Sequence, residues 1–304
     1  MRLRLVSPLG TRAGSRHSVR DLTSEVTVFV STIGDETNFK DCLRHLDRQT
    51  VRFQREIISF VAPMSAAFNE MLKRCRTKYY VQVDEDMLLF PESIEKLIEE
   101  LRRAPEHISH VAAPLWDCHL GRPLWGVKAY RHEILRRFPF KDTLSCEIQQ
   151  LDELEEAGFQ VLTLPLRWTR KECFGDHGRH FTPRTIFERW ERIMQKRRAL
   201  GRLHWVQPWP VRLLKRFART GSELDLYAFL GAVSGIVRDL PPNREADFRS
   251  SNAEFERLHE YFGHGNAVKF AILEQREKLR ESRQTWRRVW DSLLSKWRRR
   301  KATS

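Results

Sequence analysis

The sequence lacks any apolar run long enough to cross a bilayer. The longest run, residues 226–237, falls short of the roughly 18 to 20 residues that a membrane-spanning helix needs. The first 25 residues are basic and lack the apolar stretch of about 7 to 15 residues found in signal peptides. We therefore expect no transmembrane helix and no secretion signal.

Cysteine is scarce and shows no pairing pattern. The five cysteines are odd in number, widely separated and free of any Cys-x-x-Cys spacing: Cys42, Cys75, Cys118, Cys146 and Cys173. Scattered cysteines of this kind are typical of reduced thiols in a cytoplasmic protein. We expect the protein to be cytoplasmic, and at most peripheral on the cytoplasmic face of a membrane.

An excess of positive charge is absent from the first part of the chain. The formal net charge is +14, yet residues 1–182 contain 27 Lys and Arg against 26 Asp and Glu, whereas residues 183–304 contain 27 against 14. A one-sided field of this kind favours acidic partners such as anionic lipid, nucleic acid or a polyanionic glycan.

Alternating strand and helix patterns fill the middle of the chain. The predicted strands are residues 26–31, 56–61, 79–83, 110–115, 127–130 and 161–164, and the predicted helices are residues 39–46, 68–75, 94–101 and 145–157. A loop containing Trp116 and Trp125 is expected between the fourth and fifth strands. The alternation predicts an α/β fold, with a mostly parallel sheet and helices on both faces.

The two ends of the chain differ from this middle part. Residues 1–24 show no periodicity and predict a flexible basic arm. Residues 183–304 contain arginine-rich helical patterns separated by prolines, with no clear strand. We therefore expect a sheet-bearing domain over residues 25–182 and a basic, mainly α-helical region over residues 183–304.

Three consecutive carboxylates, Asp84, Glu85 and Asp86, follow one of the predicted strands. They should lie at the carboxyl end of a buried strand, where open α/β sheets bind ligands. Carboxylates spaced as Asp84 and Asp86 can hold a hard divalent cation that completes its shell with water and substrate phosphates. A solvated acidic turn is the structural alternative, because this spacing alone is weak evidence.

Several short motifs follow one another in a fixed order. They are Val-Thr-Val-Phe-Val-Ser-Thr at 26–32, Arg-Gln-Thr at 48–50, Ser-Ala-Ala-Phe-Asn at 65–69, Val-Asp-Glu-Asp at 83–86 with Pro91, and Cys146-Glu147 before Gly158. In order and spacing, residues 26 to about 182 resemble the family 2 glycosyltransferases of the GT-A fold, which use nucleotide-sugar donors. The resemblance implies a metal-dependent, inverting transfer of a sugar to a hydroxyl of a glycan or lipid-linked glycan, as in polysaccharide biosynthesis.

The resemblance also implies roles for individual residues. Contacts to the donor nucleotide are implied for Ser31, Thr32, Asn69 and Asp84. Asp86 is the implied ligand of Mn²⁺ or Mg²⁺, and His177 is the implied histidine near the metal or diphosphate, with His180 in reserve. Such a cation neutralises the negative charge that develops on a leaving diphosphate.

The implied general base is Glu147. The family usually has a Glu-Asp pair here, whereas this chain has Cys146-Glu147, so the partner acid is missing. A helix N-terminus favours negative charge, which keeps the carboxylate ionised and able to accept the proton of an acceptor hydroxyl. Asp152 is the substitute if the helix is turned differently, and helix capping by Glu147 is the structural alternative.

Other side chains leave alternatives open. Cys173, His177 and His180 could form a zinc site, although one cysteine without a second cluster is weak support. Trp116 and Trp125 flank the expected acceptor side, where flat rings could stack on a sugar or pack into the core.

Two departures from the family pattern limit what the resemblance implies. No acid ends the second predicted strand, which leaves the donor nucleotide open. Ile186 stands where processive synthases have the glutamine of Gln-x-x-Arg-Trp, although Arg189 and Trp190 are present. We therefore expect single sugar additions.

The C-terminal segment has an amphipathic pattern. Its apolar residues recur at intervals of three and four: Trp286, Trp290, Leu293, Leu294 and Trp297. With basic residues opposite them, this pattern suits a helix lying in an anionic membrane interface. Packing onto the protein's own helices is the alternative.

Two other functions compete with sugar transfer. The basic C-terminal half could bind nucleic acid, but its charge lies away from the predicted sheet, so nucleic acid is not expected as the main partner. The chain could also be a catalytically inactive scaffold, against which the intact Asp84 and Asp86 pair argues.

Overall fold

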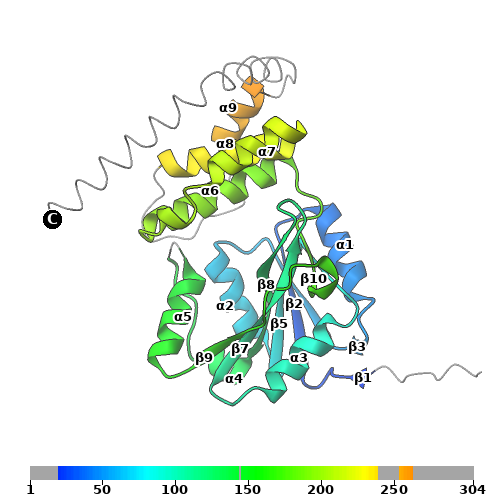
Figure 1. The fold of residues 1–304 in the computed structure, drawn as a ribbon. Coiled ribbons are helices and arrows are strands. Elements are labelled where there is room, and N and C mark those ends of the chain that lie inside the picture. Colours follow the sequence, from blue (N-terminus) through cyan, green and yellow to red (C-terminus); the bar gives the residue numbers. More distant parts are fainter. Residues whose placement is uncertain (1–19, 144, 239–252, 263–304) are drawn as a thin grey trace, which may run out of the picture.

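The computed structural model describes residues 20–143, 145–238 and 253–262. These residues form a mixed β-sheet with helices on both faces and a separate layer of helices (Figure 1). The strand order is β4-β2-β5-β8-β7-β10-β6, and β9 also pairs with β7. The strands are β2 (Val26–Thr32), β4 (Gln54–Ser59), β5 (Tyr79–Asp84), β6 (Met87–Leu89), β7 (Ile108–Asp117), β8 (Arg122–Arg131), β9 (Gln160–Thr163) and β10 (Gly175–His177).

The strand directions bring several carboxyl ends to one edge of the sheet. β4, β2 and β5 are parallel to one another, and β9 and β10 are parallel to β7. β8 is antiparallel to both of its neighbours, β5 and β7, and β6 is antiparallel to β10. β7 therefore runs in the same direction as β5. As a result, the three strands β2, β5 and β7 all end at the same edge of the sheet. The predicted α/β class, with a mixed and mostly parallel sheet, is confirmed.

One prediction about this sheet is wrong. The expected loop with Trp116 and Trp125 is instead a long antiparallel hairpin of β7 and β8, and the short strand at 127–130 is the second half of β8. Pro114, Pro123 and Gly126 interrupt the sequence pattern, yet pairing between the two strands continues across them. The register shifts between Ala113 and Pro114, which places a β-bulge in the hairpin.

The N-terminal part of the described chain is folded. β1 (Arg20–Asp21) pairs with β3 (Val51–Arg52) in a small parallel sheet. The predicted arm of residues 1–24 therefore extends too far towards the sheet, because residues 20 and 21 already form a strand. Residues 1–19 lie outside the described residues.

Two sets of helices cover the two faces of the main sheet. α1 (Glu36–Leu46) and α3 (Ser93–Arg103) pack on the face that contains Val28, Val81 and Val127. The opposite face, which we call the α2/α5 face, contains Phe29, Tyr80 and Tyr130. It is covered by α2 (Met64–Arg74), α4 (His132–Leu135) and α5 (Cys146–Glu156) (Figure 1). Helices were thus predicted correctly on both faces.

The chain then forms a helical layer. It comprises α6 (Pro183–Ala199), η2 (Leu203–Trp205), α7 (Trp209–Thr220), α8 (Glu223–Val237) and α9 (Ala253–Phe262), whereas the short helix η1 (Arg170–Glu172) comes before β10. Within the described residues from 183 onward there is no strand. No helix of the described chain is both long and apolar enough for a membrane crossing. The predicted C-terminal amphipathic helix lies outside the described residues.

Buried ion pairs join the helical layer to the carboxyl edge of the sheet. Arg189 of α6 pairs with Asp117, the last residue of β7. His119, in the turn of the hairpin, lies 2.9 Å from Asp225 of α8, which also lies 3.1 Å from Arg216 of α7. Both aspartates are completely buried. Removing one partner from such a pair leaves an uncompensated buried charge, so these contacts fix where the layer sits.

Two glycines allow α8 to approach α6 closely. A Cβ atom at Gly231 would overlap the carbonyl oxygen of Phe187, and one at Gly235 would overlap that of Glu191. The contact is therefore backbone against backbone, and any side chain at these two positions would push the helices apart.

We predict that Gly231→Ala destabilises the protein. Overpacking a tight contact costs typically about 1–3 kcal/mol, which exceeds the roughly 1 kcal/mol that alanine gains over glycine in a helix. The unfolding midpoint in urea should fall. Val233→Ala, on an exposed position of the same helix, should change the free energy of unfolding by no more than about 0.5 kcal/mol. A midpoint for Gly231→Ala at or above that of the wild type would contradict the close contact.

Candidate functional site

Ser31 and Asp84 meet at the carboxyl edge of the sheet, on the α2/α5 face. They end neighbouring parallel strands and are partners in the register of β2 and β5. The Ser31 hydroxyl donates a hydrogen bond of 2.5 Å to Oδ1 of Asp84. Desolvation, followed by the nearby charge of Asp86, raises the pKa of the Asp84 carboxyl. These two predicted donor-site residues are therefore in direct contact.

Glu85, the middle acid, serves a structural purpose on the other face of the sheet. It is buried, accepts a hydrogen bond from the Thr32 hydroxyl, and accepts a second bond of 3.2 Å from the backbone N–H of Ile33. The Thr32 hydroxyl in turn accepts a bond of 3.0 Å from Gly34 N–H. Thr32, predicted to contact the donor, thus shapes the turn after β2. No role for Glu85 was predicted from the sequence.

Asp86 and His177 come together from segments that are distant in the sequence. β10 pairs with β6, and the backbone N–H of Gly178 donates to the carbonyl of Asp86 at 3.0 Å. This pairing brings Nε2 of His177 to 3.4 Å from Oδ2 of Asp86. Nδ1 of His177 is buried without a hydrogen-bond partner, as is Nη1 of Arg189, which pairs with the neighbouring Asp117.

The Asp86 and His177 pair fits a divalent cation whose coordination substrate completes. Within the described residues, no group of three or more His, Cys, Asp or Glu side chains converges as a complete protein site. Mg²⁺ and similar cations are commonly held by one or two carboxylates together with substrate phosphates. A neutral imidazole is also a common metal ligand. One carboxylate and one imidazole at a strand edge match that pattern.

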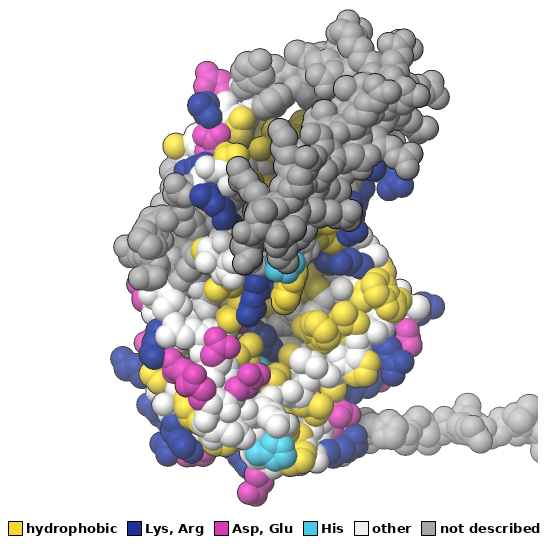
Figure 2. Space-filling model, turned by 60° about the vertical axis from the view of Figure 1, so that its left-hand side comes forward, with side chains coloured by type: hydrophobic (Ala, Val, Ile, Leu, Met, Phe, Trp, Pro, Cys, Tyr) yellow, Lys and Arg dark blue, Asp and Glu magenta, His cyan; other side chains and the backbone are white. Residues whose placement is uncertain are grey.

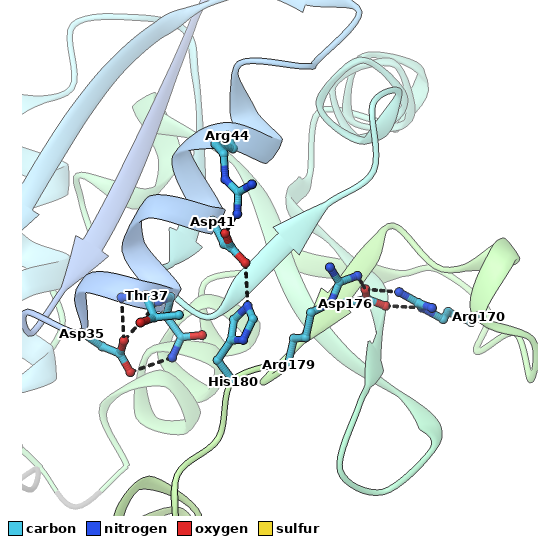
Figure 3. A network of polar contacts seen from close by, with 9 residues as sticks. Asp35, Thr37, Asp41, Arg44, Arg170, Asp176, Arg179 and His180 are labelled. Atoms are coloured by element: carbon cyan, nitrogen blue, oxygen red, sulfur yellow. Dashed lines mark hydrogen bonds and ion pairs between the residues drawn. The ribbon is translucent and has the colours of Figure 1, made fainter.

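His180 and Cys173, in the segment after β9, have other partners; the contact of His180 is shown in Figure 3. Nε2 of His180 lies 2.5 Å from Oδ2 of Asp41 on α1, so the reserve histidine is paired with α1. The Cys173 thiol donates to the carbonyl oxygens of Arg167 and Thr169. Among the described residues, these three side chains form no group that could hold a metal ion, so the zinc alternative is wrong.

Asp176, next to His177, anchors this segment. Its carboxylate is completely buried and pairs with Arg170, at 2.5 Å, and with Arg179 (Figure 3). The two guanidinium groups keep its pKa low although burial acts to raise it. Since Asp176 precedes His177 in β10, the ion pairs hold the strand that presents His177 to Asp86.

Glu147 lies in the first turn of α5 and pairs with Lys128 of β8. The Lys128 charge is the main cause that lowers the pKa of Glu147. The charge of Glu147 in turn contributes, after burial and Asp86, to the raised pKa of Asp84. Burial, followed by the Lys128 charge, lowers the pKa of His110 to about 3, so this neighbouring histidine is neutral.

Lys128 was missed from the sequence. It is a single charge in an otherwise apolar run, and it stands opposite Gln82, two residues before Asp84, only because β8 is antiparallel to β5. The sequence feature that could have indicated this role is a single lysine within an apolar run. The structure thus adds a cation to a site for which the sequence predicted only carboxylates and a histidine.

Two further predicted positions lie apart from this cluster. Asp152, the substitute base, is exposed on α5, whereas Glu147 faces Lys128. The Asn69 side chain donates to the Phe140 carbonyl and accepts from the Phe140 N–H, both at 2.8 Å. Both ends of this amide are therefore occupied in joining α2 to the loop that leads to α5.

Apolar side chains are exposed where β2 and β4 end. Phe60 is 60% exposed and Ile33 is 45% exposed. Phe60 has a φ of 54°, which is uncommon for a bulky residue. Its ring lies so close to Gly34 that a Cβ there would be 2.7 Å from Cζ. Strained backbone of this kind costs about 1–3 kcal/mol and clusters at functional sites.

The surface seen from the α5 side is hollowed between the sheet-bearing part and the helical layer, and hydrophobic and basic side chains surround the hollow (Figure 2). The helical layer stands over the carboxyl edge (Figure 1), where Asp117 meets Arg189.

No protein-family model and no curated protein sequence matches this chain. Solved structures are similar in fold. The mannosyltransferase PcManGT from Pyrobaculum calidifontis, in complex with GDP-Man and Mn²⁺, is 13% identical; the match covers 71% of this chain and 88% of that one, with a TM-score of 0.46.

Two other solved structures are also similar. Glucosyl-3-phosphoglycerate synthase from Mycobacterium tuberculosis, in complex with Mn²⁺, UDP and phosphoglyceric acid, is 14% identical over 46% of this chain and 68% of that one, with a TM-score of 0.37. 4-Diphosphocytidyl-2C-methyl-D-erythritol synthase from Anaerococcus prevotii is 9% identical over 49% and 94%, with a TM-score of 0.32. The likeness concerns the fold alone.

We predict that Lys128→Met raises the pKa of Glu147 towards its ordinary value of 4.5. Because the folded-state pKa is lowered, the pair stabilises the fold above pH 4.5 and loses that contribution as the pH falls through the lowered value. A carboxyl-carbon NMR titration of Glu147 measures the change. Lys141→Met removes a pair of 2.5 Å with Glu153 on the same helix and should leave Glu147 unchanged. Equal titration curves in both variants would contradict the assigned cause.

Proposed function

We propose that this protein is a glycosyltransferase that moves a sugar from a nucleotide-sugar donor to an acceptor hydroxyl, with inversion and in single additions. The observation that carries the proposal is the approach of His177 to Asp86, 3.4 Å apart at the edge where Ser31 and Asp84 also meet. A nucleoside diphosphate needs contacts for its nucleoside and a counter-charge for its phosphates, and this edge offers both kinds of group.

In this proposal, each group at the edge has a separate task. Ser31 and Asp84 contact the nucleoside, and Ile33 and Phe60 offer apolar surface to the base. Asp86 and His177 hold Mn²⁺ or Mg²⁺, which would neutralise charge on the leaving diphosphate. The acidic second-strand position of the resembled family is absent here, so the exposed Phe60 ring is the candidate contact that replaces it.

Glu147 is the proposed general base. The acceptor oxygen forms a bond to the anomeric carbon while the bond from that carbon to the diphosphate oxygen breaks, and the hydroxyl proton passes to Glu147. Lys128 keeps Glu147 ionised, which is the state that can accept a proton. Because Lys128 contacts Oε1, the proton can go to Oε2.

We further propose that residues 25–182 form the catalytic domain and that residues 183–304 form a basic helical region. In a cytoplasmic enzyme with a lipid-linked acceptor, the C-terminal segment would hold the protein at an anionic membrane surface. Liposome sedimentation of the full chain, compared with a chain ending at Ser282, distinguishes this from internal packing.

Asp86→Asn tests the metal-dependent reaction. We expect nucleoside diphosphates to raise the melting temperature of the wild type when Mn²⁺ or Mg²⁺ is present, since ligand at 100 times its Kd adds about 2.7 kcal/mol. The variant should lose this cation dependence and at least about 100-fold in sugar transfer, because about 2.7 kcal/mol of charge stabilisation corresponds to that factor.

The control is Asp47→Asn, which removes an exposed acid paired with Arg55 away from the edge. It should retain both properties. Unchanged transfer in Asp86→Asn, with either cation, would contradict the metal assignment. A shift produced by nucleoside triphosphates alone, with no turnover of any nucleotide sugar, would favour nucleotidyl transfer instead.

Glu147→Gln tests the base. It should retain the nucleotide-dependent melting shift and lose about 10²–10⁴-fold in sugar transfer, which is the usual contribution of a general base. Asp152→Asn, five residues further along the same helix, should remain active. The opposite pattern, with Asp152→Asn inactive and Glu147→Gln within a few-fold of the wild type, would show that the base is Asp152.

A further inference from the structure

Trp125 owes its direction to the β-bulge in the hairpin of β7 and β8. Leu124 and Val127 both pack against the core on the α1 and α3 face. In a regular strand, residues three apart lie on opposite faces. The register shift opposite Ala113 and Pro114 inserts Gly126 as an extra residue and restores both to one face.

As a result, Trp125 shares the α2/α5 face with Lys128, which also alternates with core residues. On the neighbouring strand β7, the partner of Lys128 is Ala112 and the partner of Trp125 is Pro114. These partners are two residues apart, so Lys128 and Trp125 are separated by about 7 Å along the strand direction. Trp125 is nearer the carboxyl edge than Lys128, the residue that pairs with Glu147. Trp116 stands on the same face of β7, opposite Pro123.

The Trp125 indole is both fixed and accessible. Its Nε1–H donates a hydrogen bond of 2.8 Å to the carbonyl of Leu164, just after β9. The residue nevertheless remains 49% exposed, in contrast to the buried aromatic residues of the core. Because the N–H is already used, the exposed part of the ring offers apolar and π surface only. Such a surface complements the C–H face of a sugar ring.

We propose that Trp125 is a stacking platform for a pyranose ring of the acceptor, so that the acceptor is a carbohydrate and not a bare lipid alcohol or a protein side chain. This inference rests on the proposed function, because it places the acceptor next to Glu147. A planar ring that is held at its N–H edge by Leu164 and is 49% exposed binds a sugar with little loss of side-chain freedom. The bulge is what turns this ring to the side of the sheet that carries Glu147.

The direct test is binding of simple glycosides followed by NMR. Protein labelled with ¹⁵N-tryptophan is titrated with methyl α- and β-pyranosides of glucose, mannose and galactose, with 1-butanol as the non-sugar probe. The Trp125 Nε1–H signal is identified by its absence in Trp125→Phe. We expect at least one glycoside, and not butanol, to shift this signal in a saturable way.

The variants separate the ring from its hydrogen bond. Trp125→Ala should weaken binding of the responsive glycoside about tenfold, whereas Trp125→Phe, which keeps a ring, should remain within about threefold of the wild type; tenfold corresponds to about 1.4 kcal/mol. Ligand-observed saturation transfer measures the affinity in all three proteins. Where that glycoside accepts sugar, Trp125→Ala should raise its KM and leave the donor KM unchanged.

The outcomes distinguish this inference from the proposed function. If no glycoside shifts the Trp125 signal, or if Trp125→Ala binds glycosides as well as the wild type, the platform is wrong. The nucleotide melting shift with Mn²⁺, measured in the same samples, reports on the donor site independently. A normal nucleotide shift together with no glycoside response would overturn the acceptor assignment alone.

Discussion

The arrangement of this edge depends on three consecutive carboxylates that leave the end of β5 in different directions. Asp84 continues the alternation of the strand and meets Ser31 on the α2/α5 face. Glu85 points to the other face and holds the turn after β2. Asp86 turns towards β10 and His177. Burial, followed by the neighbouring charge of Asp86, raises the pKa of Asp84. Lys128 offsets the charge of Glu147, the further carboxylate on this face.

The helical layer contributes further charged partners to this edge of the sheet. The turn of the β7 and β8 hairpin carries Asp117 and His119, and each finds its partner on a different helix of the layer. Arg189, which the sequence analysis noted only as part of the Gln-x-x-Arg-Trp motif of processive synthases, therefore joins the layer to the sheet. The charge imbalance between the two parts of the chain thus includes buried pairs as well as solvated arginines.

Much of the sheet could be predicted from the sequence because it depends on local patterns. β-Branched runs located β2, β5 and β9, and the rule that ligands bind at carboxyl ends pointed to Asp84 and Asp86. Glu147 could be placed at the start of α5 because Gly158 marks the end of that helix. Cys146, which stands where the resembled family has an acid, packs in the core of the α2/α5 face.

What could not be predicted depends on pairing between distant segments. The position of Lys128 follows from the register of an antiparallel strand, and that of His177 from the pairing of β10 with β6. Asn69 carries the residue type of a ligand contact, but its amide joins two backbone segments. Side-chain chemistry alone does not distinguish these uses, because both need the same donors and acceptors.

The bulge at Gly126 also makes the direction of the Trp125 ring depend on how one extra residue is accommodated in the strand. A Cβ at this position would lie 2.5 Å from Cδ1 of Leu115, so the extra residue fits only because it has no side chain. If Gly126 were instead paired as an ordinary strand residue, Trp125 would lie two residues from Val127 and share the face already filled by Leu115 and its neighbours. A slip of one residue in strand pairing could therefore exchange an exposed aromatic ring for a packing defect, although no residue that touches a substrate is replaced. In a strand of this kind, pairing register can change surface recognition as effectively as substitution.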